Sequence, residues 1–127
     1  MIEGWLSLRV RNPQEAGAWY ERLGLQIVGG RPDVGTIVIG TQKRGRIVVL
    51  IPGEPLEHPE RLQIHLAVEN VDAEYEKLVR AGIEFSEPPK DMPWQWRHAY
   101  TQDPSGHVVE LCSPLPSARD VDSTLMR

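Results

Sequence analysis

The side chains best suited to chemistry in this chain are its aromatic rings. Four tryptophans stand beside three tyrosines and one phenylalanine, so half of the aromatic residues carry an indole. Aromatic faces bind planar and cationic groups by stacking and through the ring quadrupole. A single cysteine, Cys112, rules out an intramolecular disulfide, a zinc ribbon and a redox pair of thiols within the chain. The inventory therefore favours ligand binding over cysteine chemistry.

Gln63 and His65 are the polar side chains of an expected strand. They alternate with Ile64, so both lie on the same face of that strand. An imidazole at this place could line a cleft as a hydrogen-bonded side chain, bind a metal ion or act as a general base. The residues alone leave these roles of His65 open.

A further group of candidates follows a proline-rich loop at residues 87–93. Trp94, Trp96 and Arg97 come directly after it. A loop of this kind at the edge of a cleft is typical of a lid or a specificity element. Strand alternation predicts that one of the two indoles points inward and the other outward or toward a partner chain.

Four other side chains are expected to have structural roles. His107 directly follows the turn at residues 103–106, called the terminal turn below, and is expected at the surface. His58 lies in the linker at residues 52–61. Cys112 belongs to an apolar strand pattern and is expected to be buried without a redox role. Trp19 falls on the apolar stripe of a predicted helix and is expected in the core.

Composition and charge limit the classes of function. The 127 residues, 40% hydrophobic and 25% charged, predict a single soluble globular domain over residues 1–127. The net charge is -4 and the basic residues do not cluster, which argues against nucleic-acid binding. No leader pattern and no apolar stretch near the roughly 20 residues of a membrane span is present, so a cytoplasmic protein is expected.

An internal repeat organises the chain. An offset of 58 residues, from Leu8 to Leu66, aligns the two halves without a gap. Copies of about 50 residues are near the lower limit for independent folding, so the two must pack together or be exchanged between chains. We expect modules at about residues 4–52 and 62–114, and a tail at residues 115–127 that covers a partner chain or is disordered.

Each copy is predicted to contain a strand, a helix and three further strands. Asn12 and Asn70 are the expected helix N-caps, and Gly24 and Gly82 the expected helix ends. The apolar helix stripes are Ala16, Trp19, Tyr20 and Leu23 in the first copy and Val71, Tyr75, Leu78 and Val79 in the second. The strands are expected at residues 5–10, 25–28, 34–39 and 46–51, and then at 63–68, 83–86, 96–102 and 107–112.

This duplicated βαβββ pattern resembles the vicinal oxygen chelate superfamily, which includes glyoxalase I, extradiol dioxygenases, fosfomycin-resistance enzymes and bleomycin-resistance proteins. The likeness covers about residues 4–114 and is most specific at residues 8–13, 19–25 and 103–111. It implies an α+β fold in which two βαβββ modules form an open, incomplete barrel around a cleft. It also implies a homodimer, because a partner chain commonly completes the cleft in this family.

The resemblance implies where a metal ion would bind. Metal-dependent members hold a divalent ion with side chains on the first and fourth strands of each module, and these positions fall here on Trp5, Val49, Gln63 and Glu110. Indole and valine offer no acceptor lone pair, whereas Glu110 is a strong ligand. No metal cofactor is therefore favoured. The remaining metal-binding arrangement is a rebuilt site of Gln63, His65, Glu110 and waters.

Trp5 and Glu110 each have two interpretations. The ring of Trp5 is expected to point into the cleft, where it stacks on a flat ligand or fills the space of the missing ion. Glu110 contacts a ligand or ion, or it pairs internally. If it is buried without metal, it must pair with Arg9 or Arg97, or accept hydrogen bonds from Gln63 and His65.

We therefore expect a metal-free small-molecule-binding protein of the glyoxalase/bleomycin-resistance type, with a small, partly aromatic or apolar organic ligand. The expected ligand-binding residues are Trp5, Val49, Gln63, His65, Trp94, Trp96, Arg97 and Glu110. The alternative is a metal-dependent lyase, isomerase or dioxygenase acting on vicinal oxygens, with Glu110 and His65 as catalytic candidates. A third hypothesis is a structural or regulatory dimer whose cleft is filled by Trp5.

Overall fold

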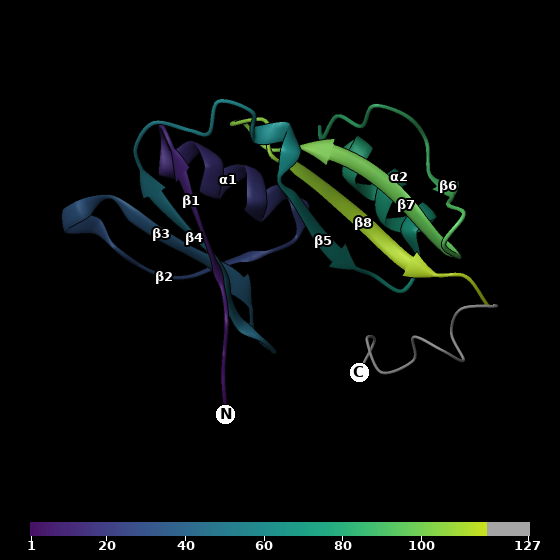
Figure 1. Ribbon diagram of the computed structural model, residues 1–127, viewed down its shortest axis with the longest axis horizontal. Helices are drawn as coiled ribbons and strands as arrows, with labels where there is room; N and C mark the ends of the chain where they lie inside the picture. Colours follow the sequence, from purple (N-terminus) through teal and green to yellow (C-terminus); the bar gives the residue numbers. More distant parts are fainter. Residues whose placement is uncertain (117–127) are drawn as a thin grey trace. The chain divides into compact units, whose positions relative to one another are not determined.

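The computed structural model describes residues 1–116, which form two compact units (Figure 1). The first unit comprises Met1–Pro59 together with Asp103–Gly106. The second comprises Glu60–Gln102 and the residues from His107 onward. The terminal turn at residues 103–106 thus belongs to the first unit, although it joins two strands of the second.

The first unit is a four-stranded sheet with one long helix, α1. Its strands follow the order β1-β4-β3-β2, in which β1 runs parallel to β4 and the other neighbours are antiparallel. The elements are β1 (Leu6–Val10), α1 (Pro13–Leu23), β2 (Gln26–Arg31), β3 (Thr36–Thr41) and β4 (Gly45–Pro52), with a short 3-10 helix at Pro32–Val34. A second 3-10 helix, Pro59–Arg61, begins at the last residue of the segment Met1–Pro59 and continues into the second unit.

Helix α1 begins and ends as its sequence predicts. The side chain of Asn12 accepts a hydrogen bond from the backbone N–H of Glu15, and Pro13 occupies the first helical position. Gly24 ends the helix with a φ of 110°, a conformation that glycine adopts without steric cost. The predicted stripe is confirmed because Ala16, Trp19, Tyr20 and Leu23 are all buried, and α1 packs on β3 and β4.

The second unit repeats this arrangement. Its strand order is β5-β8-β7-β6, and β5 pairs in parallel with β8 as β1 does with β4. The elements are β5 (Gln63–Ala67), α2 (Val71–Arg80), β6 (Lys90–Asp91), β7 (Trp96–Gln102) and β8 (Val108–Pro114). The internal repeat is thereby confirmed in topology as well as in sequence.

Helix α2 has the predicted N-cap, but it ends one residue before the predicted Gly82, with Ala81 as its C-cap, and fewer of its predicted stripe residues are buried than in α1. Asn70 accepts a hydrogen bond from the backbone N–H of Ala73, and Val71 and Leu78 are buried. Val79, expected on the buried stripe, is 46% exposed. The stripe prediction was wrong at Val79 because α2 packs on β7 and β8 along a line that already contains Leu78, leaving the adjacent position outside.

Two strand predictions are corrected. Residues 83–86 form no regular strand and make a single bridge, between Phe85 and Thr101, while the short strand β6 lies in the expected proline-rich loop. Pro88 and Pro89 lack a backbone N–H and so interrupt the ladder between the two places. In the first unit, β2 continues through the expected Gly29-Gly30 turn to Arg31 and pairs with β3 around a register shift.

The predicted α+β class with two βαβββ modules is confirmed, because each unit holds an open four-stranded sheet and a helix. Placement of the two modules around a common cleft, within a single domain, stays a prediction. The expected tail runs into residues 117–127, which lie outside the described residues. Within residues 1–116, no helix has the length and hydropathy needed to cross a membrane.

Candidate functional site

Three strands of the second unit bring polar and aromatic side chains to one sheet face. In the register of the sheet, Glu110 on β8 stands between His65 on β5 and Tyr100 on β7. His98 lies two residues before Tyr100 on β7 and therefore shares its face. Arg97, on the opposite face, bonds to Asp72 at the start of α2. The face that holds Glu110 is thus the one that α2 does not cover.

A pocket of about 370 Å³ lies on this face, within the size range of small-molecule sites. It is lined by His65, Ala67, Trp94, Trp96, His98 and Cys112. Both indoles line the pocket, so the predicted division into an inward and an outward ring was wrong. Alternation holds within a strand, and Gln95, with a φ of 69°, redirects the chain between Trp94 and the start of β7.

Glu110 is buried and paired with imidazoles. Its side chain is 1% exposed, and its Oε1 lies 2.6 Å from Nε2 of His65. Its Oε2 contacts Nδ1 of His98, whose side chain is 3% exposed. Glu110 is therefore paired internally. His65 is one of the partners expected for it, and the second partner is His98 rather than Gln63 or an arginine.

His98 has two further polar neighbours. Its Nε2 accepts a hydrogen bond from the indole Nε1–H of Trp94 at 3.2 Å, and its Nδ1 lies 3.0 Å from the hydroxyl of Tyr100. Sequence reasoning selected neither His98 nor Tyr100 as a ligand-binding residue. The signal was present as a period of two from Trp96, which places Trp96, His98 and Tyr100 on one strand face.

The buried carboxylate affects nearby acidic groups. Burial raises the pKa of Tyr100, and the negative charge of Glu110 raises it further. Burial and then the same charge raise the pKa of Cys112 to about 11. Both groups are therefore neutral near pH 7, and the Cys112 side chain is a poor nucleophile, as its predicted buried position suggested.

Alkylation of Cys112 by iodoacetamide is expected to be slow in the native protein at pH 8, because little thiolate is present and the thiol is buried. The rate should rise as the pH approaches 11. Mass spectrometry of the carboxamidomethylated protein measures this rate, and protein unfolded in urea is the control. Equal rates for native and unfolded protein at pH 8 would contradict this prediction.

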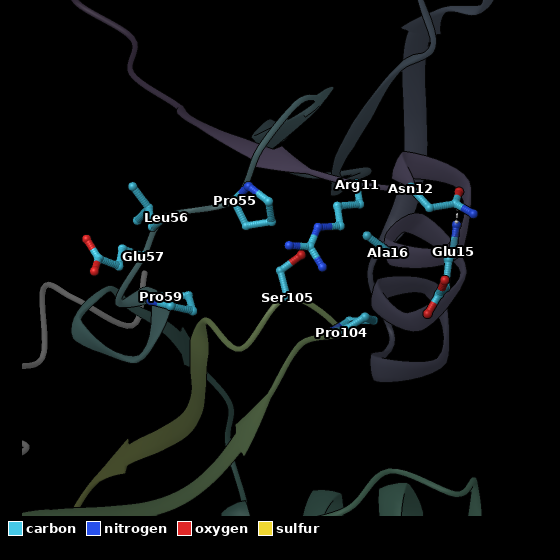
Figure 2. Close-up of a pocket in the computed structure, with 10 residues that line it drawn as sticks. All are labelled: Arg11, Asn12, Glu15, Ala16, Pro55, Leu56, Glu57, Pro59, Pro104 and Ser105. Carbon is cyan, nitrogen blue, oxygen red and sulfur yellow. Dashed lines mark hydrogen bonds between the residues drawn. The ribbon is translucent and has the colours of Figure 1, made fainter.

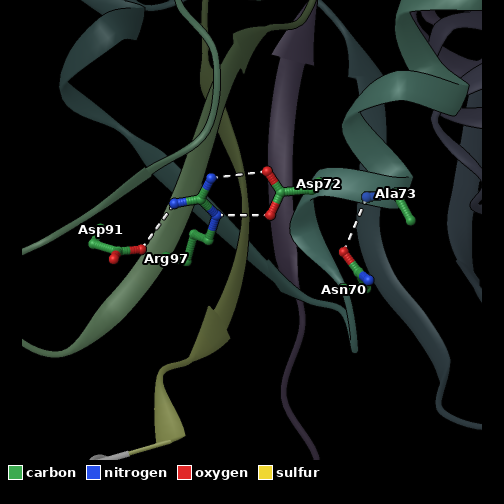
Figure 3. A network of polar contacts seen from close by, with 5 residues as sticks. All are labelled: Asn70, Asp72, Ala73, Asp91 and Arg97. Atoms are coloured by element: carbon green, nitrogen blue, oxygen red, sulfur yellow. Dashed lines mark hydrogen bonds and ion pairs between the residues drawn. The ribbon is translucent and has the colours of Figure 1, made fainter.

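Gln63 and Arg97 lie apart from the pocket lining. Gln63 is exposed on β5 and pairs with Val108 in the register of the sheet. The guanidinium of Arg97 is held by Asp72 at 2.7 and 2.8 Å and by Asp91 at 2.8 Å (Figure 3). These hydrogen bonds lower the pKa of Asp72 and raise that of Arg97. Arg97 therefore links α2 to β6, and its predicted role in ligand binding stays a prediction.

Trp5 and Val49 belong to the first unit. They share one sheet face, because Ser7 of β1 pairs with Val49 and Trp5 lies two residues before Ser7. Trp5 is 50% exposed, and the guanidinium carbon of Arg46 lies 4.7 Å from its ring centroid. A cation already stacks on this indole. Val49 lines a neighbouring pocket of about 510 Å³ with Arg46 and Val38.

The donor set does not fit a divalent ion of the predicted type. Trp5 and Val49 supply no lone pair, and both oxygens of Glu110 face imidazole nitrogens. Among residues 1–116 no group of three histidine, cysteine, aspartate or glutamate side chains is arranged to hold a metal ion. The expectation that no metal cofactor binds nevertheless stays a prediction.

His107 corrects another prediction, since it is fully buried rather than at the surface. Gly106, with a φ of 92°, ends the terminal turn, and the chain then enters the core as β8 begins. Trp19 and Cys112 are buried as predicted.

A pocket of about 440 Å³ in the first unit contains none of the predicted site residues. It lies at the start of α1 and is lined mainly by the segment at residues 55–59 and the terminal turn (Figure 2). Arg11 points into it, and its guanidinium lies 3.6 Å from the carboxylate of Glu54, an exposed pair of small energetic value. The pocket on the second sheet is therefore the stronger candidate site.

Comparison with known proteins agrees with the α+β fold of two βαβββ modules. A family model described as "Glyoxalase/Bleomycin resistance protein/Dioxygenase superfamily" matches residues 4–111. Among solved structures, TioX from Micromonospora sp. ML1 is 25% identical, with a TM-score of 0.72 and coverage of 90% of this chain and 100% of that chain. TnmS3, an antibiotic binding protein from Streptomyces sp. CB03234, is 26% identical, with a TM-score of 0.69 and coverage of 90% and 97%.

A bleomycin-binding protein complexed with bleomycin is 20% identical, with a TM-score of 0.70 and coverage of 89% of this chain and 98% of that chain. At this identity the likeness is one of fold. No curated protein matches the chain.

Proposed function

The chain belongs to the glyoxalase/bleomycin resistance protein/dioxygenase superfamily, and within it we propose that the protein binds a small organic molecule without using a metal ion. The ligand is partly aromatic or apolar and contacts the pocket on the second sheet. One observation carries this proposal. Two indoles, Trp94 and Trp96, line one pocket together with Ala67 and Cys112, beside a carboxylate that is already paired.

The physical basis is the balance of apolar and polar lining. Stacking on an aromatic face and burial of apolar surface supply affinity, and a few fixed polar groups supply orientation. Trp96 is half-buried at the start of β7, and Trp94 is 55% exposed at the rim. Two antibiotic-binding proteins of the same fold, TnmS3 and the bleomycin-binding protein, are consistent with a binding role.

Replacement of Trp96 by alanine is expected to weaken ligand binding by about tenfold, because it removes the stacking surface nearest the strand. Quenching of tryptophan fluorescence by a panel of planar organic compounds identifies a ligand. Isothermal titration calorimetry then gives its Kd for each variant. Val79→Ala, an exposed change on α2, is the matched control and should leave the Kd unchanged. If no compound in a chemically diverse panel binds, the proposed function is wrong.

The alternative is a metal-dependent lyase, isomerase or dioxygenase. The observation that favours it is the position of Glu110, which is a ligand position of the family and has two imidazoles beside it. In that case the purified protein retains stoichiometric divalent metal, and chelation abolishes an activity. Metal analysis by mass spectrometry distinguishes the two functions, and Glu110→Ala would then also abolish metal uptake.

We also propose that the protein is cytoplasmic and forms a homodimer, because partner chains commonly complete the cleft in this family. Sedimentation equilibrium measures the oligomeric state directly, and a monomer at all accessible concentrations would overturn the proposed homodimer.

A regulatory dimer without a ligand, in which Trp5 fills the cleft, predicts that no compound changes the tryptophan fluorescence. Arg46 already covers one face of Trp5, so we favour the pocket on the second sheet as the binding site.

A further inference from the structure

The pocket on the second sheet has hydrogen-bond acceptors at its polar end, and Glu110 sets their arrangement. An ionised carboxylate accepts hydrogen bonds and donates none. The nitrogens that face Glu110, Nε2 of His65 and Nδ1 of His98, must therefore carry protons. In a neutral imidazole the other nitrogen is then an acceptor. The buried carboxylate thus leaves Nδ1 of His65 and Nε2 of His98 as hydrogen-bond acceptors for a ligand.

Trp94 independently fixes the same tautomer of His98. Its indole Nε1–H is a donor without acceptor capacity, and it lies 3.2 Å from Nε2 of His98. That nitrogen must be unprotonated, which leaves the ring proton on Nδ1 beside Glu110. The acceptor at Nε2 is therefore present at the pocket, where an indole of this chain occupies it.

His65 supplies the second acceptor. Its Nε2 bonds to Glu110 at 2.6 Å, and its side chain is 56% exposed at the pocket. In the neutral ring, Nδ1 is left with a lone pair. The rings of His65 and His98 are near each other, with centroids 6.2 Å apart. A single planar molecule can therefore reach both.

The lining of the pocket on the second sheet favours a positively charged ligand. Ala67, Trp96 and Cys112 make the other walls apolar, which strengthens the attraction of a ligand charge to the buried carboxylate. Indole faces attract cations through their quadrupole. Trp94, 55% exposed and next to the left-handed Gln95, is placed to exchange its hydrogen bond with His98 for one from a ligand.

We propose that this pocket selects planar aromatic cations that carry N–H donors, such as aromatic amines and amidines, whose N–H groups bond to Nε2 of His98 and Nδ1 of His65. The inference rests on the proposed binding function and names the ligand class for the same pocket. The positive charge lies near Glu110, the ring stacks on Trp96, and Trp94 gives up its bond to His98.

The test compares two planar cations with the same ring system at pH 8. Isothermal titration calorimetry is run with 9-aminoacridine, which carries amino N–H donors, and with 10-methylacridinium, which carries none. The aminoacridine is expected to bind at least about tenfold more tightly, since two hydrogen bonds distinguish the ligands. Glu110→Gln should reduce this ratio to below about threefold, while the exposed control Glu76→Gln retains it.

Trp94→Phe separates recognition from structural damage. It keeps an aromatic ring but removes the N–H that competes for His98, so the ratio in favour of 9-aminoacridine should increase by about threefold. A variant that merely weakened the fold would weaken both ligands. Equal affinities of the two cations for the native protein, or an unchanged ratio in Trp94→Phe, would overturn the inference while leaving the binding function in place. If neither these cations nor any other planar compound binds, both proposals fail.

Discussion

Replacement of Asp103 by alanine is expected to lower the free energy of unfolding by about 2–4 kcal/mol. Asp103 is 4% exposed in the terminal turn, and its Oδ2 accepts a hydrogen bond from the hydroxyl of Tyr20 at 2.7 Å. Its Oδ1 accepts one from the backbone N–H of Ser105 at 3.0 Å. The alanine side chain leaves both donors without these acceptors, and the hydroxyl of Tyr20 is buried.

The pairing also changes the chemistry of Tyr20. Burial and the adjacent charge of Asp103 raise the pKa of Tyr20 far above its ordinary value, so the phenol remains a donor throughout the usual pH range. Asp103 thus connects the terminal turn to the buried face of α1 in the first unit through its hydrogen bond with Tyr20.

Urea denaturation of a short series measures this contribution. Tyr20→Phe removes one hydrogen bond and should cost about 1–2 kcal/mol, less than Asp103→Ala. The double variant should cost less than the sum of the single changes, because the two side chains share one bond. If Asp103→Ala has the stability of the native protein, the bond network at the terminal turn contributes nothing to folding.

Replacement of Gly40 by alanine is expected to destabilise the first unit by about 3 kcal/mol or more. Gly40 lies on β3 where its register with β4 shifts, opposite the start of that strand. A Cβ atom there would overlap the carbonyl oxygen of Gly45 and lie 2.9 Å from Cα of Arg46. Both are backbone atoms, so no side-chain rotation relieves the overlap, and the strands must separate.

Gly29→Ala is the matched control in the same sheet. A Cβ atom at Gly29 would meet the side chain of Val38 at 3.7 Å, an ordinary contact. This change should alter the stability by less than about 1 kcal/mol. Thermal unfolding followed by circular dichroism compares the two variants. Equal melting temperatures for Gly40→Ala and Gly29→Ala would show that the close approach of β3 and β4 is not required.

Local patterns in the sequence predicted much of this fold. The caps at Asn12 and Asn70 and the buried stripe of α1 depend on residues within a few positions of each other. The interactions that decide them lie within one helix, so a single chain segment contains the whole signal. The strand predictions were correct where the apolar alternation was clear. They were wrong at residues 83–91, where Pro88 and Pro89 interrupt the pairing.

The candidate site was predicted in part. The family positions and the alternation of β5 pointed to Gln63, His65 and Glu110, and the loop before β7 pointed to the two tryptophans. His65 was expected as a hydrogen-bond partner of Glu110 and is one. The second partner, His98, was not found, because it depends on the register of β7 against β8, in which Tyr100 stands beside Glu110. An arginine was the natural expectation for a buried carboxylate, yet Arg97 is on the other face and is bound to Asp72.

The sequence by itself determined the repeat, the helix ends and the chemistry at the family's metal positions, where Trp5 and Val49 lack lone pairs. The tertiary structure decided which side chains meet. It placed His98 on Glu110, brought Trp94 into the same pocket through the left-handed Gln95, and buried His107. The physical reason is that helix signals act over one or two turns, whereas strand register and sheet faces are set by contacts between distant segments.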